Sequence, residues 1–305
     1  MSYKHLNDST IPYVNKPLKE KIKWIRAEHF VYYPKAKKCL EQLKWIFEQT
    51  SFYDNDDLPY DLEGLTIVGD SGAGKTYIVK EFMRLHSTEH HPTYEGYPVG
   101  YCMLKDSITG LKGLYSALLS AYGHPYGDSS IFRIQRITID QLEETLLHVL
   151  KKTQTRLLFI DEFQHAMGRN QQAILNQLKR TMLISHVPFV AIGVPHVTNI
   201  LKLDSQLADR CPIREYSKLD YWSLNINFKQ FLAGYERYLP FPEPSGLGSK
   251  ELSRKIFKKL VDNDGANARR TNLRRVVRFL KKAAVRALNK GHKKIMEEDI
   301  NDMQY

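Results

Sequence analysis

The chain has little cysteine and no long apolar stretch. Its three cysteines, Cys39, Cys102 and Cys211, are odd in number and far apart, so the sequence supports neither a disulfide framework nor a paired-cysteine zinc site. No apolar run approaches the ~18 residues needed to cross a bilayer. The first residues also lack the apolar core of a secretion signal. We therefore expect a cytoplasmic protein with buried free thiols and no membrane partner.

The composition is that of a globular protein with a substantial core. The chain has 305 residues, of which 42% are hydrophobic and 26% charged. The pattern of elements predicts three parts: an N-terminal extension with a first helix over residues 1–50, an α/β core over 51–220, and a basic helical lid over 221–305.

Positive charge is concentrated at the two ends of the chain. The formal net charge is +11. Residues 251–305 carry 15 Lys/Arg against 7 Asp/Glu, and residues 1–50 carry 10 against 5, so the middle of the chain is slightly acidic. Basic ends around such a centre favour a polyanionic partner, most often nucleic acid. Basic helices that only keep the protein soluble remain the alternative.

A glycine-rich segment fits a phosphate-binding loop at every position. Residues 69–76 match G-x-x-x-x-G-K-[ST], follow a strand-like run over 64–68, and open an amphipathic helix. The glycines allow backbone N–H groups to converge on phosphates at the start of a helix. We expect Lys75 to reach the β- and γ-phosphates and Thr76 to bind Mg²⁺. The predicted nucleotide-binding residues here are Gly69, Asp70, Ser71, Gly72, Ala73, Gly74, Lys75, Thr76 and Tyr77.

A second motif, which contains two acidic residues, follows some 85 residues after the phosphate-binding loop. The apolar run 156–160 reads as a buried strand that ends in Asp161 and Glu162, the Walker B pattern. Asp161 is predicted to hold the water shell of Mg²⁺, and Glu162 to polarise the water that attacks the γ-phosphate. The two motifs together predict binding and hydrolysis of ATP with Mg²⁺.

Strands and helices alternate around these motifs. We expect strands at 99–104, 187–193 and 213–216, and helices at 111–122, 138–152 and 171–184, with a capping box from Thr138 to Gln141. Such alternation predicts a parallel sheet with helices on both faces. The intervening units favour the ASCE branch of P-loop proteins. From about residue 222 the pattern is helical only, with predicted helices over 224–238, 249–263, 271–289 and 297–303.

Several segments resemble the TniB/TnsC family of AAA+ ATPases, which regulate DNA transposition, including that of CRISPR-associated transposons. The phosphate-binding loop and the Walker B strand are common to all AAA+ proteins. More discriminating are the aromatic N-terminal preface that begins with Trp24-Ile25-Arg26, the segment Asp-Glu-Phe-Gln-His at 161–165, and Gln-Leu-Ala-Asp-Arg at 206–210. The resemblance implies an AAA+ α/β fold with a small C-terminal helical lid.

The resemblance also implies roles for three arginines. Arg210 stands where the family places an arginine finger that reaches the nucleotide of a neighbouring subunit, with Arg214 as the reserve candidate. A surface salt bridge with Asp209 is the alternative role of Arg210. Arg274 stands at the family's sensor 2 position, where a DNA-facing or merely solvated helix is the alternative. Val194 departs from the family pattern, which has a small polar residue there, so hydrolysis is expected to be slow unless His196 substitutes for that residue.

The resemblance also implies that the segment after the second strand of the core contacts DNA. There Lys105 and Lys112 would neutralise phosphates, and Thr109 would donate a hydrogen bond to the DNA backbone. Thr109 could equally cap the next helix.

The resemblance implies a regulator that assembles with itself, as a ring or a filament, on double-stranded DNA when ATP binds. It would present that DNA to a DDE transposase, with a TniQ-like adaptor or a CRISPR effector as the recruiting partner. The alternatives are a helicase loader or replication initiator, a P-loop kinase of a small molecule, and a scaffold that binds ATP but scarcely hydrolyses it. The sequence does not specify the number of subunits.

Overall fold

The computed structural model describes residues 3–50, 62–86, 89–91, 94–106, 110–127, 137–166, 171–262 and 270–301. The chain divides into two compact units. The first unit comprises Met1–Lys37, Gly72–Gly74 and Asp220–Tyr305, and the second comprises Lys38–Ser71 and Lys75–Leu219. The N-terminal segment thus groups with the C-terminal helices. The domain division at residues 50 and 220 stays a prediction.

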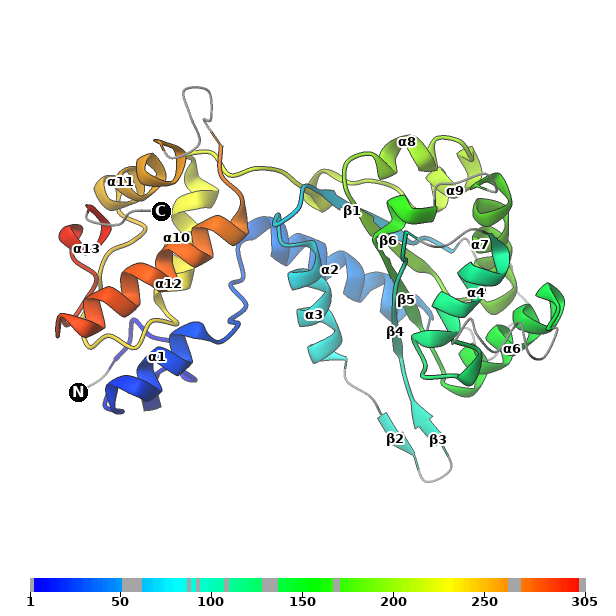
Figure 1. Ribbon diagram of the computed structural model, residues 1–305, viewed down its shortest axis with the longest axis horizontal. Helices are drawn as coiled ribbons and strands as arrows, with labels where there is room; N and C mark the ends of the chain where they lie inside the picture. The colour runs from blue at the N-terminus through cyan, green and yellow to red at the C-terminus, as the bar shows by residue number, and fades with distance from the viewer. Residues whose placement is uncertain are drawn as a thin grey trace. The chain divides into compact units, whose positions relative to one another are not determined.

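The second unit is built on a five-stranded parallel sheet (Figure 1). Its strands lie in the order β4 (Val99–Met103), β5 (Leu157–Asp161), β6 (Phe189–Gly193), β1 (Leu65–Gly69) and β7 (Lys218–Leu219). Every residue of β1, β5 and β6 is buried, as expected for parallel strands covered on both faces. A separate antiparallel pair joins β2 (Glu89–His91) to β3 (Tyr94–Gly96). Because β6 lies between β1 and β5, the predicted ASCE arrangement is confirmed.

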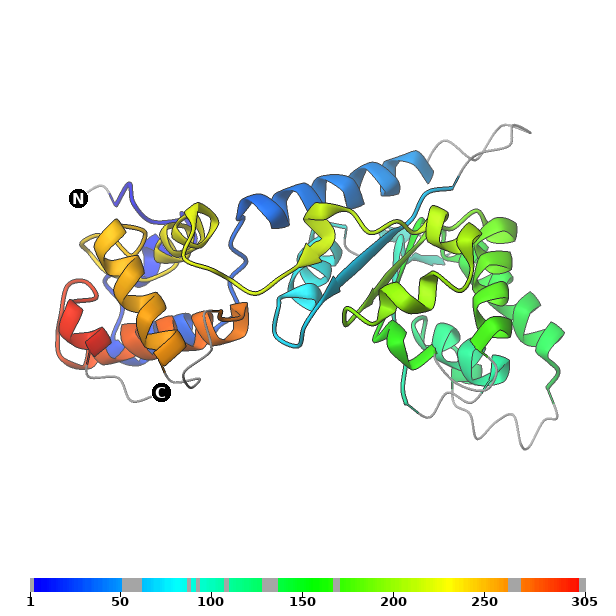
Figure 2. The ribbon, with the colours of Figure 1, turned by 90° about the horizontal axis from the view of Figure 1, so that it is seen from above.

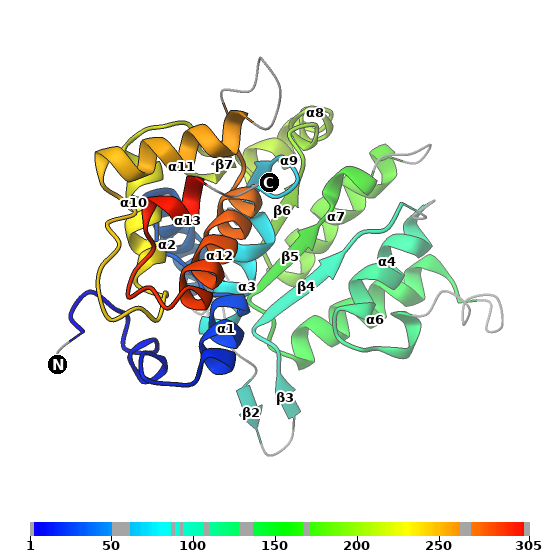
Figure 3. The same cartoon turned by 60° about the vertical axis from the view of Figure 1, so that its left-hand side comes forward.

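Helices cover both faces of this sheet, as the alternating pattern predicted. Figures 1 and 3 show α4 (Leu111–Ser120), α6 (Ile139–Lys152) and α7 (Gln171–Ser185) on one face, and α2 (Pro34–Gln49) and α3 (Lys75–Leu85) on the other. Two short helices, α8 (Val197–Leu201) and α9 (Ser205–Arg210), follow β6. The predicted capping box is present at the start of α6. The Thr138 hydroxyl accepts the N–H of Gln141 at 3.2 Å, and the Gln141 side chain accepts the N–H of Thr138 at 2.9 Å.

Aromatic side chains join α2, α3 and the sheet. The Phe82 ring of α3 lies 5.8 Å from that of Phe47 on α2 and 5.7 Å from that of Phe159 on β5, both edge to face. The Arg156 guanidinium lies 4.0 Å from the centre of the Phe47 ring. Phe82 is only 1% exposed, so its ring fixes α3 against the strand that ends in Asp161.

The first unit contains five α-helices among its described residues. They are α1 (Leu18–Arg26), α10 (Ile226–Glu236), α11 (Lys250–Asp262), α12 (Leu273–Asn289) and α13 (Glu297–Asn301), and they follow a short 3₁₀ turn, η1 (Ile11–Tyr13) (Figure 2). Trp24 of α1 stacks on Tyr13 with ring centres 4.1 Å apart, and its indole N–H donates to the carbonyl of Tyr238 at 2.9 Å. Trp24 of the aromatic preface therefore packs against other aromatic and backbone groups of this unit.

The last predicted strand is wrong in position. Residues 213–216 were expected to be extended, but a 3₁₀ turn, η5 (Glu215–Ser217), stands there and the strand β7 comes after it. The Ser217 hydroxyl closes this turn, because it accepts the N–H of Arg214 at 3.0 Å and donates to the carbonyl of Arg214 at 2.9 Å. The sequence also gave no indication of helix α1 or of the β2–β3 pair.

Two expectations from composition concern the chain as a whole. Cys39, Cys102 and Cys211 are all buried with free thiols, as predicted. Among the helices that the structure describes, none combines the length and the apolar character that crossing a membrane requires.

Replacement of Phe82 by alanine tests the aromatic junction. Because the ring is buried between a helix and the sheet, Phe82→Ala should lower the free energy of unfolding by about 3–5 kcal/mol. Urea denaturation followed by circular dichroism measures this change. Phe82→Leu, which retains most of the apolar volume, should cost clearly less. A loss of under about 1 kcal/mol for the alanine variant would contradict the packing role.

Candidate nucleotide-binding site

The phosphate-binding loop connects β1 to the first turn of α3. Gly72 and Gly74 have φ angles of +81° and +104°, which glycine adopts without the steric cost of a side chain. Asp70, Ser71 and Ala73 complete the loop, and α3 begins at Lys75. The N-terminus of this helix presents N–H groups without helical partners and the positive end of its dipole, which favours an anion such as phosphate.

Lys75 is folded over the loop. Its ammonium donates to the carbonyls of Gly69 at 2.6 Å and Asp70 at 3.2 Å, and the residue is only 9% exposed. Thr76 and Tyr77 follow it in the first turn of α3. The loop backbone thus holds the cation at the place where the sequence predicts a triphosphate.

The Asp161 carboxylate accepts three hydrogen bonds at the end of β5. One carboxylate oxygen accepts the Tyr101 hydroxyl at 2.7 Å and the Thr76 hydroxyl at 3.3 Å, and the other accepts the N–H of Glu162 at 2.8 Å. Asp161 is 2% exposed. Burial raises the pKa of Tyr101, and the hydrogen bond to Asp161 raises it further, so the phenol remains a proton donor. The structure therefore brings together Thr76 and Asp161, the two predicted metal ligands.

Glu162 has an unusual backbone conformation. Its φ is +55°, a left-handed value that costs a residue other than glycine about 1–3 kcal/mol and is often found at functional sites. The carboxylate accepts a hydrogen bond from the side-chain amide of Gln164. The Gln164 carbonyl oxygen accepts the N–H of Val194 at 3.3 Å, so Gln164 connects Glu162 to the residue that follows β6. A Cβ atom on Gly193 would collide with this oxygen, so the bridge requires glycine there.

Sequence reasoning missed two of these side chains. Gln164 belongs to η4 (Phe163–Ala166) and to the Asp-Glu-Phe-Gln-His segment. This segment indicates the family, but the sequence pattern predicts no role for its glutamine. Its amide oxygen accepts the backbone N–H of Val194, whose own side chain is apolar. Tyr101 had no sequence signal, because only the pairing of β4 with β5 brings it to Asp161.

Part of the predicted DNA-contacting segment lies next to this site. Lys105 is exposed, and the carboxylate of Asp106 after it contacts one ring nitrogen of His165, whose other ring nitrogen lies 3.9 Å from the Glu162 carboxylate. The Lys112 ammonium donates to the carbonyl of Ile137 at 2.6 Å, so it is bound within the chain. Thr109 lies outside the described residues.

The two candidate finger residues line one cavity of the second unit. Arg210 ends α9, and Arg214 lies just before η5. Both border a cavity of about 690 Å³, together with Trp45. Arg214 donates to the Glu63 carboxylate at 2.9 Å, a hydrogen bond that raises the pKa of this arginine. Arg210 stays the finger that the family resemblance implies, with Arg214 as the reserve candidate.

Arg274 lies in the first turn of α12. Its backbone N–H donates to the carbonyl of Gly72 at 3.0 Å, and both residues belong to the first unit. The Asn272 side chain caps the helix by accepting the N–H of Arg275 at 2.9 Å. The backbone of Arg274 thus meets the Gly72–Gly74 segment.

A known protein family matches most of this sequence. The sequence profile of the family described as bacterial TniB protein matches residues 21–223, about two thirds of the chain. The chain belongs to the TniB family. No curated protein matches the sequence.

Solved structures show the fold that this TniB chain adopts. The Aeropyrum pernix ORC1 protein in complex with DNA has a TM-score of 0.55 at 12% identity, over 92% of this chain and 67% of that one. The Aeropyrum pernix ORC2 protein in ADPNP–ADP complexes has a TM-score of 0.57 at 15% identity, over 91% and 70%. Drosophila ORC bound to DNA gives 0.52 at 14%, over 96% and 65%. The chain spans about two thirds of the length of these proteins, and the likeness shows the AAA+ fold.

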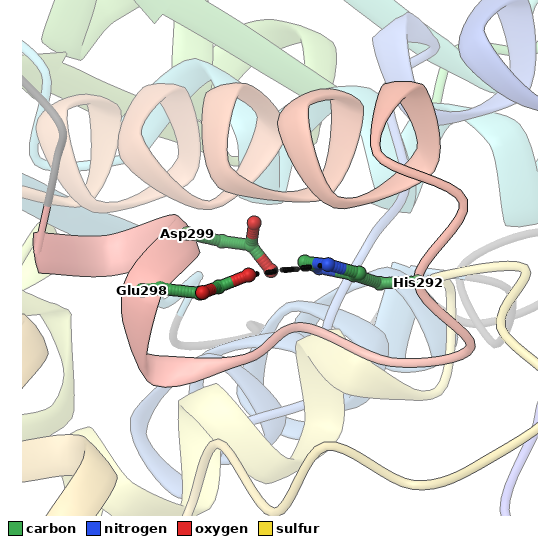
Figure 4. A group of neighbouring side chains, drawn as sticks. All are labelled: His292, Glu298 and Asp299. Carbon is green, nitrogen blue, oxygen red and sulfur yellow. Dashed lines mark hydrogen bonds and ion pairs between the residues drawn. The ribbon is translucent and has the colours of Figure 1, made fainter.

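A second polar cluster stands near the end of the chain (Figure 4). The ligand atoms of His292, Glu298 and Asp299 lie within 4.8 Å of one another, as a metal site would require. Both imidazole nitrogens already face carboxylates, at 3.0 Å from Asp299 and 3.2 Å from Glu298. The Lys290 ammonium lies 3.5 Å from Glu298 and 3.7 Å from Asp299 and would repel a second cation. Asp299 also accepts the N–H of Met296 at 2.9 Å, so the cluster fastens the turn before α13.

This interpretation predicts a structural role for Asp299 without a metal. Asp299→Asn should lower the free energy of unfolding by about 2 kcal/mol, less than for a fully buried pair because His292 and Lys290 are partly exposed. Glu298→Gln, the matched change at an exposed side chain, should cost under about 1 kcal/mol. Thermal denaturation measures both variants. Stabilisation of the wild type by Zn²⁺, lost in Asp299→Asn, would show that the cluster is a metal site instead.

Proposed function

We propose that this chain is an ATP- and Mg²⁺-dependent regulator of DNA transposition that works in the cytoplasm. In this proposal the chain assembles with itself on duplex DNA and presents that DNA to a DDE transposase. The observation that carries the nucleotide part is the hydrogen bond between Thr76 and Asp161, which joins the start of α3 to the end of β5. Membership of the TniB family supports the transposition part.

The donor set of the site fits a nucleotide with Mg²⁺. Lys75 and the start of α3 supply positive charge for phosphates, and Thr76 and Asp161 supply the hard oxygen ligands that Mg²⁺ prefers. Bound ATP–Mg²⁺ would supply the γ-phosphoryl group and a cation that neutralises its charge. Tyr101 keeps one oxygen of Asp161 oriented by donating to it.

Glu162 is the residue we propose to orient and deprotonate the attacking water. Gln164 fixes its carboxylate, and no polar side chain stands at Val194, so the glutamine amide provides the polar contact expected there. Gln164 is thus a positioning residue that acts through Glu162.

Assembly on DNA is supported by charge and by similar folds. Two of the similar solved structures are described as bound to DNA or in complex with it. Arg210, which borders the cavity that contains Trp45, is proposed as the finger that reaches the nucleotide of a neighbouring copy. The transposase, a TniQ-like adaptor and a CRISPR effector are proposed as partners from the family resemblance.

Three substitutions test the proposal in ATP turnover and in sedimentation with duplex DNA. Lys75→Ala should abolish nucleotide-dependent assembly, because the phosphates lose their cation. Glu162→Gln should still assemble, while turnover falls at least ~100-fold through loss of the base. Arg210→Ala should weaken self-association. Arg214→Ala removes the same charge from the same cavity and should leave self-association unchanged. A wild-type protein that stays monomeric and ignores duplex DNA with a non-hydrolysable ATP analogue would refute the proposal.

Gln164 has its own prediction. Gln164→Ala should lower kcat for ATP hydrolysis about tenfold or more and leave KM nearly unchanged, because the amide contacts Glu162 and the end of β6. Steady-state hydrolysis assays separate the two constants. Val194→Ala keeps the backbone N–H that Gln164 accepts and should hydrolyse ATP like the wild type. Faster hydrolysis in Gln164→Ala would mean that the glutamine restrains Glu162 instead of positioning it.

A further inference from the structure

Five of the seven residues that line a cavity in the first unit are cations. It measures about 440 Å³ and lies along α12 at the end of α1, two helices that run side by side in Figures 1 and 3. We call it the basic cavity, and its lining consists of Arg26, Lys281, Lys282, Val285, Arg286, Asn289 and Lys290. Among the described residues, no carboxylate belongs to this lining.

The basic cavity lies in the unit that carries most of the positive charge of the sequence. The segments of the first unit carry 26 Lys/Arg against 13 Asp/Glu, a net charge of +13 in a chain of +11, so the second unit has −2. Helix α12 contains six of these cations and no acidic residue. The excess charge of the protein therefore belongs to the unit that contains this cavity.

Lys281 gives the basic cavity a fixed wall. Its ammonium donates to the carbonyls of Arg26 at 2.8 Å and Ala27 at 2.7 Å, which ties α12 to the C-terminal end of α1, where a cation is favoured. Burial lowers the pKa of Lys281, and the charge of Glu28 opposes this shift. Lys281 thus has a structural role in the wall of the basic cavity.

The remaining cations have a regular spacing. Lys282, Arg286 and Lys290 follow one another at four-residue intervals, about 6 Å apart along the helix axis, and together span about 12 Å. One strand of B-DNA has a charge every ~3.4 Å along its axis, so this span matches about three to four phosphates. Lys290 is also held by Glu298 and Asp299, so it is kept at the end of the row.

The partner that fits this surface is a phosphate chain rather than a lipid bilayer. The buried residues of α12 include Val276, Phe279 and Leu280, and Val285 is the one apolar residue of the lining. Binding to a membrane surface needs an apolar face in addition to charge. An electrostatic contact without base recognition needs only the cations.

We propose that the basic cavity binds the phosphodiester backbone of duplex DNA without reading its sequence. This inference rests on the proposed function, because it requires a protein that acts on DNA. It adds a DNA-binding surface in the first unit to the Lys105 segment of the second unit.

The test compares duplex binding by the full-length wild type and a variant of the basic cavity, Arg26→Gln/Lys282→Gln/Arg286→Gln, with an ATP analogue present. The variant should bind at least ~10-fold more weakly at ~0.1 M salt, and the slope of log affinity against log salt should fall by about 2–3, because each lost phosphate contact removes about one unit. A random-sequence duplex measured by fluorescence anisotropy is the probe.

The matched control removes the same charge from the same unit. Lys250→Gln/Arg254→Gln/Lys258→Gln changes three exposed cations of α11 at the same spacing, and it should keep the wild-type affinity and salt slope. The charge-preserving variant Lys282→Arg/Arg286→Lys should also bind like the wild type, which separates loss of charge from misfolding.

Each alternative outcome has a distinct meaning. Equal loss in the α11 control would show that only total charge matters and would overturn the inference. Unchanged binding by the variant of the basic cavity would overturn it and leave the proposed function standing. No duplex binding by the wild type would refute the proposed function itself. Loss of binding to vesicles of anionic phospholipid, with duplex binding retained, would assign the basic cavity to membranes.

Discussion

The hydrogen bond between Thr76 and Asp161 joins residues that are 85 positions apart, and the proposed chemistry depends on the strand order that makes it possible. The carboxyl ends of parallel strands meet at one edge of a sheet, so the loop after β1, the acids after β5 and Val194 after β6 gather there. Since β6 lies between β1 and β5, the amide of Gln164 can reach across from η4 to Val194. An antiparallel strand in this order would carry one of these groups to the opposite edge.

Local patterns in the sequence predicted the elements and motifs that depend on nearby residues. Thr138 and Gln141 cap α6 through contacts three residues apart, and the glycines at 72 and 74 have the φ values that their loop requires. Tyr101 escaped prediction because its partner is set by the register between two strands. The prediction of a strand at 213–216 was wrong because a single hydroxyl, that of Ser217, closes a turn there. The neighbouring residues on their own favour an extended backbone.

The two units divide the physical work of the protein. The second unit has almost no net charge and a buried sheet, so its Lys75, Thr76 and Asp161 are held by a few hydrogen bonds between fixed groups in a shielded setting. The first unit has a large positive charge, for which the row of cations on α12 provides a surface suited to long-range and salt-dependent attraction. A nucleotide needs the first kind of site, and a DNA backbone is satisfied by the second.

Glu162 shows why a motif alone does not produce the geometry of a site. Its left-handed φ is unfavourable for a side chain, so surrounding contacts must hold it. The N–H of Glu162 donates to Asp161, its carboxylate accepts from Gln164, and His165, itself paired with Asp106, approaches from a third direction. These partners come from β5, from η4 and from the segment after β4. The identity of Glu162 can be read from the sequence, but the conformation that aims its carboxylate is a property of the folded unit.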